Sequence, residues 1–201
     1  MDLMENQPFI PYVEEKDYPE RLKPVLDPYV ERMGFLPNAL KLYMHRPEIA
    51  ETLWKLNNNI MRDPTSTLDQ GLKRRLGAVA SRINGCAYCT SHHCTILKTP
   101  AGGGAEGWGM SHAELLELMR GDNEPRDEME RVCFDYVRAA SDDPRHVPED
   151  VYRRLRELLT PAQVVELACL VGFWKMYNTI HDSLRVPIEE HVQPNAEYVT
   201  R

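Results

Sequence analysis

The chain has 201 residues, of which 42% are hydrophobic and 27% are charged, and this composition is sufficient to form a buried core. Its length favours a single domain, because domains cluster at roughly 100–150 residues. With 24 basic and 31 acidic side chains, the formal net charge is −7. This charge argues against a general binder of nucleic acid or anionic membranes, since both rely on a basic surface. No apolar run reaches the roughly 18–20 residues that cross a bilayer, and the first residues lack the order of a secretory signal, so we expect a cytoplasmic protein.

The pattern of apolar residues is typical of helices, which predicts an all-α fold. Val, Ile and Thr do not gather into alternating runs, and prolines stand between or at the starts of most apolar stretches. We expect a loosely ordered arm over residues 1–17, followed by helices near residues 18–33, 37–45, 47–62, 68–84, 86–98, 111–120, 126–141, 148–158 and 161–184. The chain then divides into an N-terminal arm with the first helix, a helical domain and a C-terminal tail, over residues 1–34, 35–188 and 189–201.

Three capping boxes indicate where helices begin. A hydroxyl is followed three residues later by a Gln or Glu at Thr67, Ser111 and Thr160. Such a pair satisfies two backbone N–H groups that the first turn of a helix leaves open. Aligning Thr67 with Thr160 also aligns two long apolar helices, which suggests a weak internal duplication of a helical hairpin.

Residues 99–110 form a glycine-rich stretch that holds five of the eleven glycines of the chain. This composition predicts a flexible loop, and it carries one large apolar side chain, Trp108. Two interpretations remain open: a surface connection held in place by its tryptophan, or a lid over a functional site.

Five cysteines in a chain without an export signal argue against a secreted disulfide framework and favour redox or metal chemistry. Three of them, Cys86, Cys89 and Cys94, lie within nine residues. The other two, Cys133 and Cys169, lie in apolar helical contexts, where we expect plain core packing.

The sharpest pattern in the sequence is Cys86-x-x-Cys89-x-x-x-His93. Asn84-Gly85 interrupts the preceding helix, so a new helix is expected to begin at Cys86, where free N–H groups favour a thiolate. At about 100° per residue, Cys86, Cys89 and His93 share one stripe of that helix. The imidazole is then close enough to exchange a proton with the thiol of Cys89, which is how a cysteine nucleophile is activated.

Three interpretations compete for this pattern. A redox dithiol needs two sulfurs one turn apart, a reactive thiolate and a proton carrier, and all three are available. A zinc site would use Cys86, Cys89 and His92 or His93, with Cys94 as a further candidate, but no second pair of metal ligands exists elsewhere. The third interpretation is a cysteine-rich helix that merely packs. The spacing favours the redox dithiol.

The motif, preceded by Ser81-Arg82-Ile83-Asn84-Gly85, resembles the alkylhydroperoxidase D-like core of the carboxymuconolactone decarboxylase superfamily, and its peroxidase-related branch most closely. The similarity extends to Phe35-Leu36-Pro37-Asn38-Ala39, to His45-Arg46-Pro47-Glu48, and to the last long helix from Leu159 through Pro187. It therefore covers about residues 35–188.

This resemblance implies an all-α helical bundle that assembles as a homo-oligomer and needs no cofactor, metal or flavin. It also implies that Cys89 is the peroxidatic thiol, that Cys86 resolves the sulfenic acid to a disulfide, and that His93 belongs to the proton relay. The substrate would be a peroxide or another small molecule, and a dithiol protein or a thiol would be the reductant.

The chain departs from the family pattern at two positions. Hydroperoxidases of the family carry a glutamate twelve residues before the first cysteine, where this chain has Arg74, and a histidine between the cysteines, where it has Tyr88. Arginine favours a thiolate but cannot accept a proton. We therefore treat Arg74 and Tyr88 as supporting residues, and either another carboxylate replaces the glutamate or the activity differs.

Weaker candidates lie on the last long helix. His181 with Asp182 could orient a site group, and Glu166 is a candidate substitute base. Two alternative functions also stay open: a cofactor-free decarboxylase or lactone-acting enzyme, and a non-catalytic protein that binds metals or thiols.

Overall fold

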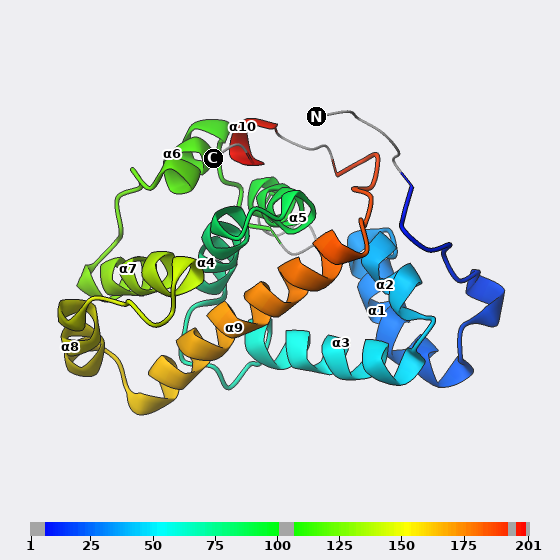
Figure 1. Cartoon of the computed structure of the whole chain (residues 1–201), viewed down its shortest axis with the longest axis horizontal. Helices are drawn as coiled ribbons and strands as arrows, with labels where there is room; N and C mark the ends of the chain where they lie inside the picture. The colour runs from blue at the N-terminus through cyan, green and yellow to red at the C-terminus, as the bar shows by residue number, and fades with distance from the viewer. Residues whose placement is uncertain (1–6, 101–106, 193–195, 200–201) are drawn as a thin grey trace.

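The computed structural model describes residues 7–100, 107–192 and 196–199. Among these residues every regular element is helical and none is a strand, which confirms the predicted all-α class (Figure 1). Two short 3-10 helices, η1 (Glu15–Asp17) and η2 (Glu20–Leu22), are followed by α1 (Lys23–Met33), α2 (Asn38–Tyr43), α3 (Pro47–Met61), α4 (Gln70–Ile83), α5 (Ala87–Lys98), α6 (His112–Arg120), α7 (Glu128–Asp142), α8 (Glu149–Leu158), α9 (Pro161–Ser183) and α10 (Ala196–Val199).

Two of the three predicted capping boxes form as expected. Ser111 and Thr160 each accept a hydrogen bond from the backbone N–H three residues later, and Glu114 and Gln163 bond back. The prediction at Thr67 is wrong, because α4 begins two residues later and the carboxylate of Asp69 accepts from the N–H of Leu72 instead. Both residue types suit this position, so local propensity could not distinguish between them.

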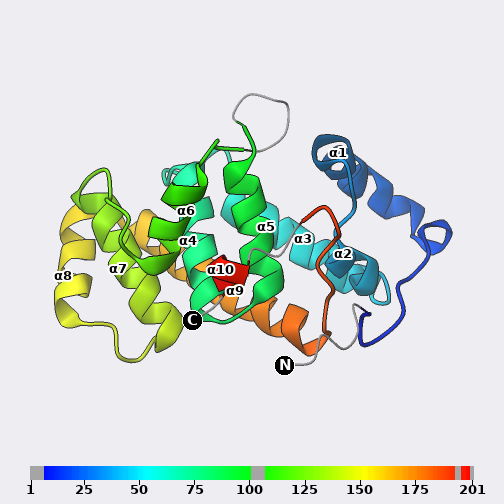
Figure 2. The ribbon, with the colours of Figure 1, turned by 90° about the horizontal axis from the view of Figure 1, so that it is seen from above.

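Helix α4 is the centre of the molecule. It contacts α5, α6, α7 and α9 along its length, and α3 near one end. In Figure 1, α9 crosses the front of the bundle from the α7 and α8 side toward α2, and Figure 2 shows α5 beside α4 on the opposite side from α8. Small residues such as Gly71, Ala78 and Ala80 are buried on α4, which lets so many helices approach it.

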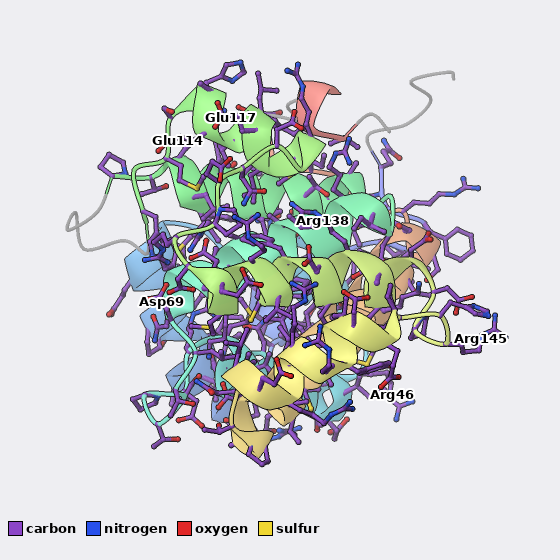
Figure 3. All side chains as sticks on the ribbon, turned by 90° about the vertical axis from the view of Figure 1, so that its left-hand side faces the viewer. Arg46, Asp69, Glu114, Glu117, Arg138 and Arg145 are labelled. Carbon is purple, nitrogen blue, oxygen red and sulfur yellow. The ribbon has the colours of Figure 1, made fainter. Side chains whose placement is uncertain are left out.

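The flank formed by α6, α7 and α8 has the usual division between an apolar inner face and a charged outer face. On α6, Leu115 and Leu118 are buried, whereas Glu114 and Glu117 are exposed and lie on the outside in Figure 3. On α7, Phe134 is fully buried under the guanidinium of Arg138, which lies 5.2 Å from the ring centre. This flank supports α4 without reaching the thiols.

The segment that the sequence assigned to a C-terminal tail packs onto the helical body. Val192 and Tyr198 are buried, and the hydroxyl of Tyr198 lies 2.5 Å from Nδ1 of His112. Lys98, at the end of α5, places its ammonium 4.8 Å from the centre of the Tyr198 ring. Residues 189–192 and 196–199 are therefore part of the packed structure.

Two further expectations concern the glycine-rich loop and the weak internal duplication of a helical hairpin. Residues 101–106 of the loop lie outside the described residues, while Trp108 packs beside Gly71 on α4. The two stretches aligned at Thr67 and Thr160 both contain long helices, but α9 is continuous where the first stretch turns between α4 and α5. None of the described helices has the length and apolar character needed to cross a membrane.

Candidate functional site

The turn between α4 and α5 places both cysteines of the motif at a helix start, as the sequence predicts. Gly85 has φ of 83°, a left-handed conformation that favours glycine. Cys86 is the N-cap of α5, and its sulfur accepts from the N–H of Cys89 at 3.5 Å. The hydroxyl of Thr90 donates to the Cys86 carbonyl at 2.8 Å, which fixes the first turn.

The turn is also bound to α9. The side-chain amide of Asn84 donates to Oδ1 of Asn178 at 2.7 Å, and the amide of Asn178 donates to the Ser81 hydroxyl at 3.2 Å. Because buried polar groups need partners, this small network holds α9 in one register against the cysteine turn. That register decides which side chain of α9 meets the sulfurs.

The side chain that meets them is the imidazole of His181. Its Nδ1 lies 2.9 Å from Sγ of Cys89, and the two sulfurs and one ring nitrogen of His181 all lie within 4.8 Å of one another. Cys86 and Cys89 are both free thiols and both buried, at 0% and 3% exposure. The structure thus brings together two thiols and a histidine, and this histidine is His181 rather than the predicted His93.

Burial rather than the helix start dominates the ionisation of Cys89. Desolvation, together with the hydrogen bond and charge of the Cys86 thiol, raises the pKa of Cys89 well above its ordinary value. Burial also lowers the pKa of His181 to about 3, an effect that nearby His92 strengthens and Glu189 opposes. Cys89 and His181 therefore rest as a neutral thiol beside a neutral imidazole.

His93, the histidine of the predicted stripe, faces the same region from the next turn of α5. Its ring lies 4.2 Å from that of Trp174, and both ring nitrogens are buried without a protein hydrogen-bond partner. Burial, with the charges of Arg74 and His92, lowers the pKa of His93 well below its ordinary value. A Cβ at Gly77 of α4 would lie 2.6 Å from this ring, so glycine is required there.

A partly open cavity of about 100 Å³ joins these groups. Cys89 forms part of its wall, whereas Cys86 lies behind Cys89 and does not line it. Aromatic side chains make up most of the wall, and several buried polar atoms around it lack a protein partner. The lining residues are Tyr29, Pro37, Ala39, Leu40, Tyr43, Trp54, Asn57, Arg62, Arg74, Tyr88, Cys89, His92, His93, Ile96, Trp174, Tyr177 and His181.

Both supporting residues of the sequence prediction line this cavity. Arg74 is 3% exposed, so it does not belong to a solvated basic face. Tyr88 is buried, its ring lies 4.9 Å from the His181 ring, and its hydroxyl donates to Glu189 at 3.0 Å. The roles of Cys86, Cys89, His93, Arg74 and Tyr88 stay predictions, but four of these five residues share one cavity wall and Cys86 lies directly behind it.

Sequence reasoning gave too little weight to one residue of the site and missed another. His181 follows Trp174 and Tyr177 at helical spacing, so its position on the buried face of α9 was a usable signal. Glu189 lies in a segment without periodicity after α9, and no local pattern pointed to it. The other candidate base, Glu166, bonds the hydroxyl of Ser66 at 2.5 Å and does not line the cavity.

The remaining cysteines take different roles from the pair. Cys94 is buried on another side of α5, and burial raises its pKa to about 12. Cys133 is in the core, as expected. Cys169 is exposed on α9, so the prediction of core packing is wrong there, because its helix face carries no covering element among the described residues.

Comparison with known proteins finds a family match over the segment that carries the cysteine pair. Residues 47–107, which contain α3, α4 and α5, match the model of the carboxymuconolactone decarboxylase family. No curated protein sequence matches the chain. The match confirms, for this segment, the family resemblance predicted from the cysteine motif, and the solved structures below show the fold.

Three solved structures share the fold. An uncharacterized peroxidase-related protein from Silicibacter sp. TM1040 has a TM-score of 0.76 and 21% identity, with 100% of this chain and 98% of that chain covered. A peroxidase-related alkylhydroperoxidase AhpD core from Ralstonia eutropha JMP134 has a TM-score of 0.75 and 18% identity, with 96% and 94% covered. The apo debrominase Bmp8 has a TM-score of 0.75 and 22% identity, with 93% and 94% covered.

Proposed function

We propose that this chain, which carries the carboxymuconolactone decarboxylase family segment on an alkylhydroperoxidase D-like fold, is a thiol-dependent peroxidase. Cys89 would be the attacking sulfur and Cys86 the resolving one. The observation that carries this proposal is that Cys89 lines the cavity and that its sulfur, the Cys86 sulfur and the His181 nitrogen lie within 4.8 Å of one another. A substrate in the cavity can reach Cys89, and Cys86 is close enough to react with it afterwards.

The reaction needs no group other than thiols, an imidazole and a peroxide. As the Cys89 sulfur attacks one peroxide oxygen, its proton passes to His181, the O–O bond breaks and a sulfenic acid forms. The other peroxide oxygen leaves with a proton as an alcohol or water. The Cys86 sulfur then displaces water from the sulfenic acid to form a disulfide, and a dithiol or thiol returns two electrons by exchange.

The raised pKa of Cys89 makes the imidazole contact necessary. A buried thiol that stays protonated at neutral pH is a weak nucleophile, so its proton must leave as the sulfur attacks. Nδ1 of His181, at 2.9 Å, is in position to take it, and the lowered pKa of His181 keeps that ring neutral and able to accept. His93 would line the substrate side of the cavity.

The test is a single-turnover reaction of the reduced protein with hydrogen peroxide, followed by mass spectrometry of the thiols. We expect a disulfide between Cys86 and Cys89 in the unaltered protein and a trapped sulfenic acid on Cys89 in Cys86→Ser. We expect no peroxide consumption in Cys89→Ser, since removal of a nucleophile lowers rates by several orders of magnitude. Cys94→Ser and Cys169→Ser are the matched controls and should react normally. Peroxide consumption that survives Cys89→Ser would exclude the proposal.

The aromatic walls favour a second candidate that uses the same sulfurs. Tyr88, Trp174 and Tyr177 surround the cavity with rings, as suits a small aromatic ligand, and a debrominase has this fold. Reductive removal of halogen from an aromatic carbon would consume two thiols and yield the dehalogenated ring, a halide ion, a proton and the same disulfide. Halide release from a halogenated pyrrole or phenol, without peroxide turnover, would select this candidate.

The two alternatives that the sequence left open are separated by simple measurements. A cofactor-free decarboxylase would use acid and base groups, so its activity should survive Cys89→Ser. A metal-binding protein is favoured by the closeness of Cys86, Cys89 and His181, and one zinc per chain in freshly reduced protein would support it. The physiological reductant and the expected homo-oligomer stay predictions.

A further inference from the structure

A carboxylate that the proposed mechanism does not use lies behind the cavity wall. Glu189 belongs to the segment that follows α9, and this segment folds back across α2 and α5. Its carbonyls bind two other parts of the chain: Leu184 accepts from the N–H of Phe9 at 3.0 Å, and Pro187 accepts from the side-chain amide of Asn38 at 3.0 Å. The position of Glu189 is therefore fixed from both sides.

Three donors surround the carboxylate of Glu189. The N–H of Asn38 donates at 2.6 Å and the Tyr88 hydroxyl at 3.0 Å to Oε1, while Nε2 of His92 lies 2.7 Å from Oε2. Burial by itself would raise the pKa of Glu189, but the hydrogen bond and charge of His92, with the N–H of Asn38, lower it to about 2. Glu189 is thus a buried anion at neutral pH.

Two of these three partners are walls of the cavity. Tyr88 and His92 both line it, and the Tyr88 ring lies 4.4 Å from the His92 ring and 4.9 Å from the His181 ring. Because an anionic carboxylate faces Nε2, that nitrogen carries a proton, and a proton on Nδ1 then makes the ring a cation paired with Glu189. The cavity therefore has two different imidazoles: His181 contacts the Cys89 sulfur, and His92 contacts the Glu189 carboxylate.

We propose that the His92 imidazole, held by Glu189, is the acid that protonates the oxygen leaving the peroxide. This inference rests on the proposed peroxidase function and assigns a role that the motif gave to no residue. His92 would touch the leaving oxygen, and Glu189 would be a positioning residue that acts through it. Together they take the place of the relay glutamate that is absent at Arg74.

The protons and electrons of the step balance. His181 takes the proton of the Cys89 thiol, the sulfur forms a bond to the nearer peroxide oxygen, and the pair of electrons of the O–O bond goes to the farther oxygen. His92 gives that oxygen a proton, so it leaves as water or an alcohol. The proton on His181 then returns to His92 through solvent, and no net proton is consumed.

Other charged groups around Glu189 do not supply this role. Tyr12, from the N-terminal arm, has its pKa raised by burial and by the Glu189 charge, so it stays neutral. Lys41 on α2 bonds Oδ1 of Asn38 at 3.0 Å rather than the carboxylate. Among the described lining residues of the cavity there is no carboxylate, so Glu189 contacts the cavity wall through Tyr88 and His92, beyond its longer-range effect on His181.

The experiment compares two oxidants that differ in their leaving group. Hydrogen peroxide releases hydroxide, a strong base that needs a proton, whereas peracetic acid releases acetate, which leaves without one. We expect Glu189→Gln to slow single-turnover oxidation of Cys89 by hydrogen peroxide about 100-fold and to change oxidation by peracetic acid no more than about threefold, because general acids assist poor leaving groups most. His92→Asn should behave in the same way.

Two controls make the result decisive. Glu190→Gln removes the same charge from the adjacent, exposed position and should change neither rate. Tyr88→Phe removes one bond to Glu189 but keeps His92, so it should preserve the ratio of the two rates. If Glu189→Gln fails to fold, His92→Asn alone carries the test.

The outcomes separate this inference from the function on which it rests. If neither oxidant reacts with Cys89 in the unaltered protein, the peroxidase proposal itself is wrong. If both oxidants react and Glu189→Gln slows them equally or not at all, the peroxidase proposal stands and the acid role of His92 and Glu189 is overturned. A loss confined to hydrogen peroxide supports the inference.

Discussion

The cavity beside α5 and the buried carboxylate on the flank around α7 differ in how their polar atoms are bonded. On the flank, the carboxylate of Glu130 is 3% exposed on its side chain and binds both Arg75 and Arg126, the latter at 2.8 Å. Around the cavity, the Tyr43 hydroxyl, both nitrogens of His93 and the indole N–H of Trp174 are buried without a protein partner. Glu130 holds α7 against α4 through Arg75, whereas the polar atoms named at the cavity have no protein group to bond.

This difference indicates which part of the bundle is suited to bind a ligand. A buried polar atom without a partner lowers stability by about 1–3 kcal/mol, so several around one cavity indicate that water or a ligand supplies the missing bonds. A satisfied ion pair such as that of Glu130 carries no such implication. Variants on the flank should therefore change stability alone, and variants at the cavity should change chemistry and acid stability.

The largest effect on stability is expected at Glu130. Glu130→Gln leaves the guanidinium of Arg75 without its buried anion, and breaking a buried pair lowers the free energy of unfolding by about 3–5 kcal/mol. Urea unfolding at neutral pH measures this change. Glu157→Gln, which removes an exposed pair with Arg153, is the matched control and should change stability by less than about 0.5 kcal/mol. Equal effects of the two variants would show that the buried pair of Glu130 stabilises the fold no more than the exposed pair of Glu157.

At the cavity, acid should weaken the fold through His181. The pKa of this ring is lowered to about 3 in the folded protein, so below pH 6.5 the unfolded chain binds a proton that the folded chain does not. The contribution of His181 is complete above that pH and decreases by up to about 1.4 kcal/mol per pH unit as the pH falls toward 3. His93 acts in the same direction.

Urea unfolding at several pH values between 7 and 4.5 measures this dependence. In His181→Asn the slope of unfolding free energy against pH should decrease by about one proton. An unchanged slope would show that His181 is not buried and neutral. Glu157→Gln on the flank should leave the slope as it is.

A smaller effect is expected where α4 meets the cavity. In Gly77→Ala the new Cβ would lie 2.6 Å from both the His93 ring and the Trp174 indole nitrogen, and such overpacking lowers stability by about 1–3 kcal/mol. The displaced His93 should also alter the rate of Cys89 oxidation. Gly172→Ala on α9 is the matched control, because its Cβ meets nothing within 4 Å, and it should stabilise the helix by up to about 1 kcal/mol. Gly77→Ala without loss of stability would mean that these rings move easily.

The helices could be predicted from the sequence because their causes are local. Apolar spacing, prolines and capping residues place α3, α5 and α9 within two residues of their observed bounds. The error at the start of α4 has the same local origin, since Thr67 and Asp69 are both good N-caps and only the packing of α4 selects between them. The first predicted helix, at residues 18–33, is observed as α-helix only from Lys23, because η1 and η2 before it form 3-10 turns that no local pattern indicated.

Only the part of the candidate site that lies on one helix could be predicted from the sequence. Cys86, Cys89 and His93 lie on one short segment, and helical geometry alone relates them. His181 and Glu189 come from distant parts of the chain, and they reach the sulfurs and the cavity wall because Asn178 and Asn38 fix the register of their segments. The pKa of Cys89 shows the same limit, because a helix start lowers it locally and burial by neighbouring helices raises it more.

The sequence by itself determined an all-α bundle and a pair of thiols one turn apart at the beginning of a helix. Only the tertiary structure decided which imidazole meets the attacking sulfur, which carboxylate stands behind the cavity, and that the thiol is neutral. The physical reason is range: backbone hydrogen bonding and helical periodicity act over a few residues, whereas desolvation and side-chain contacts depend on which segments pack together.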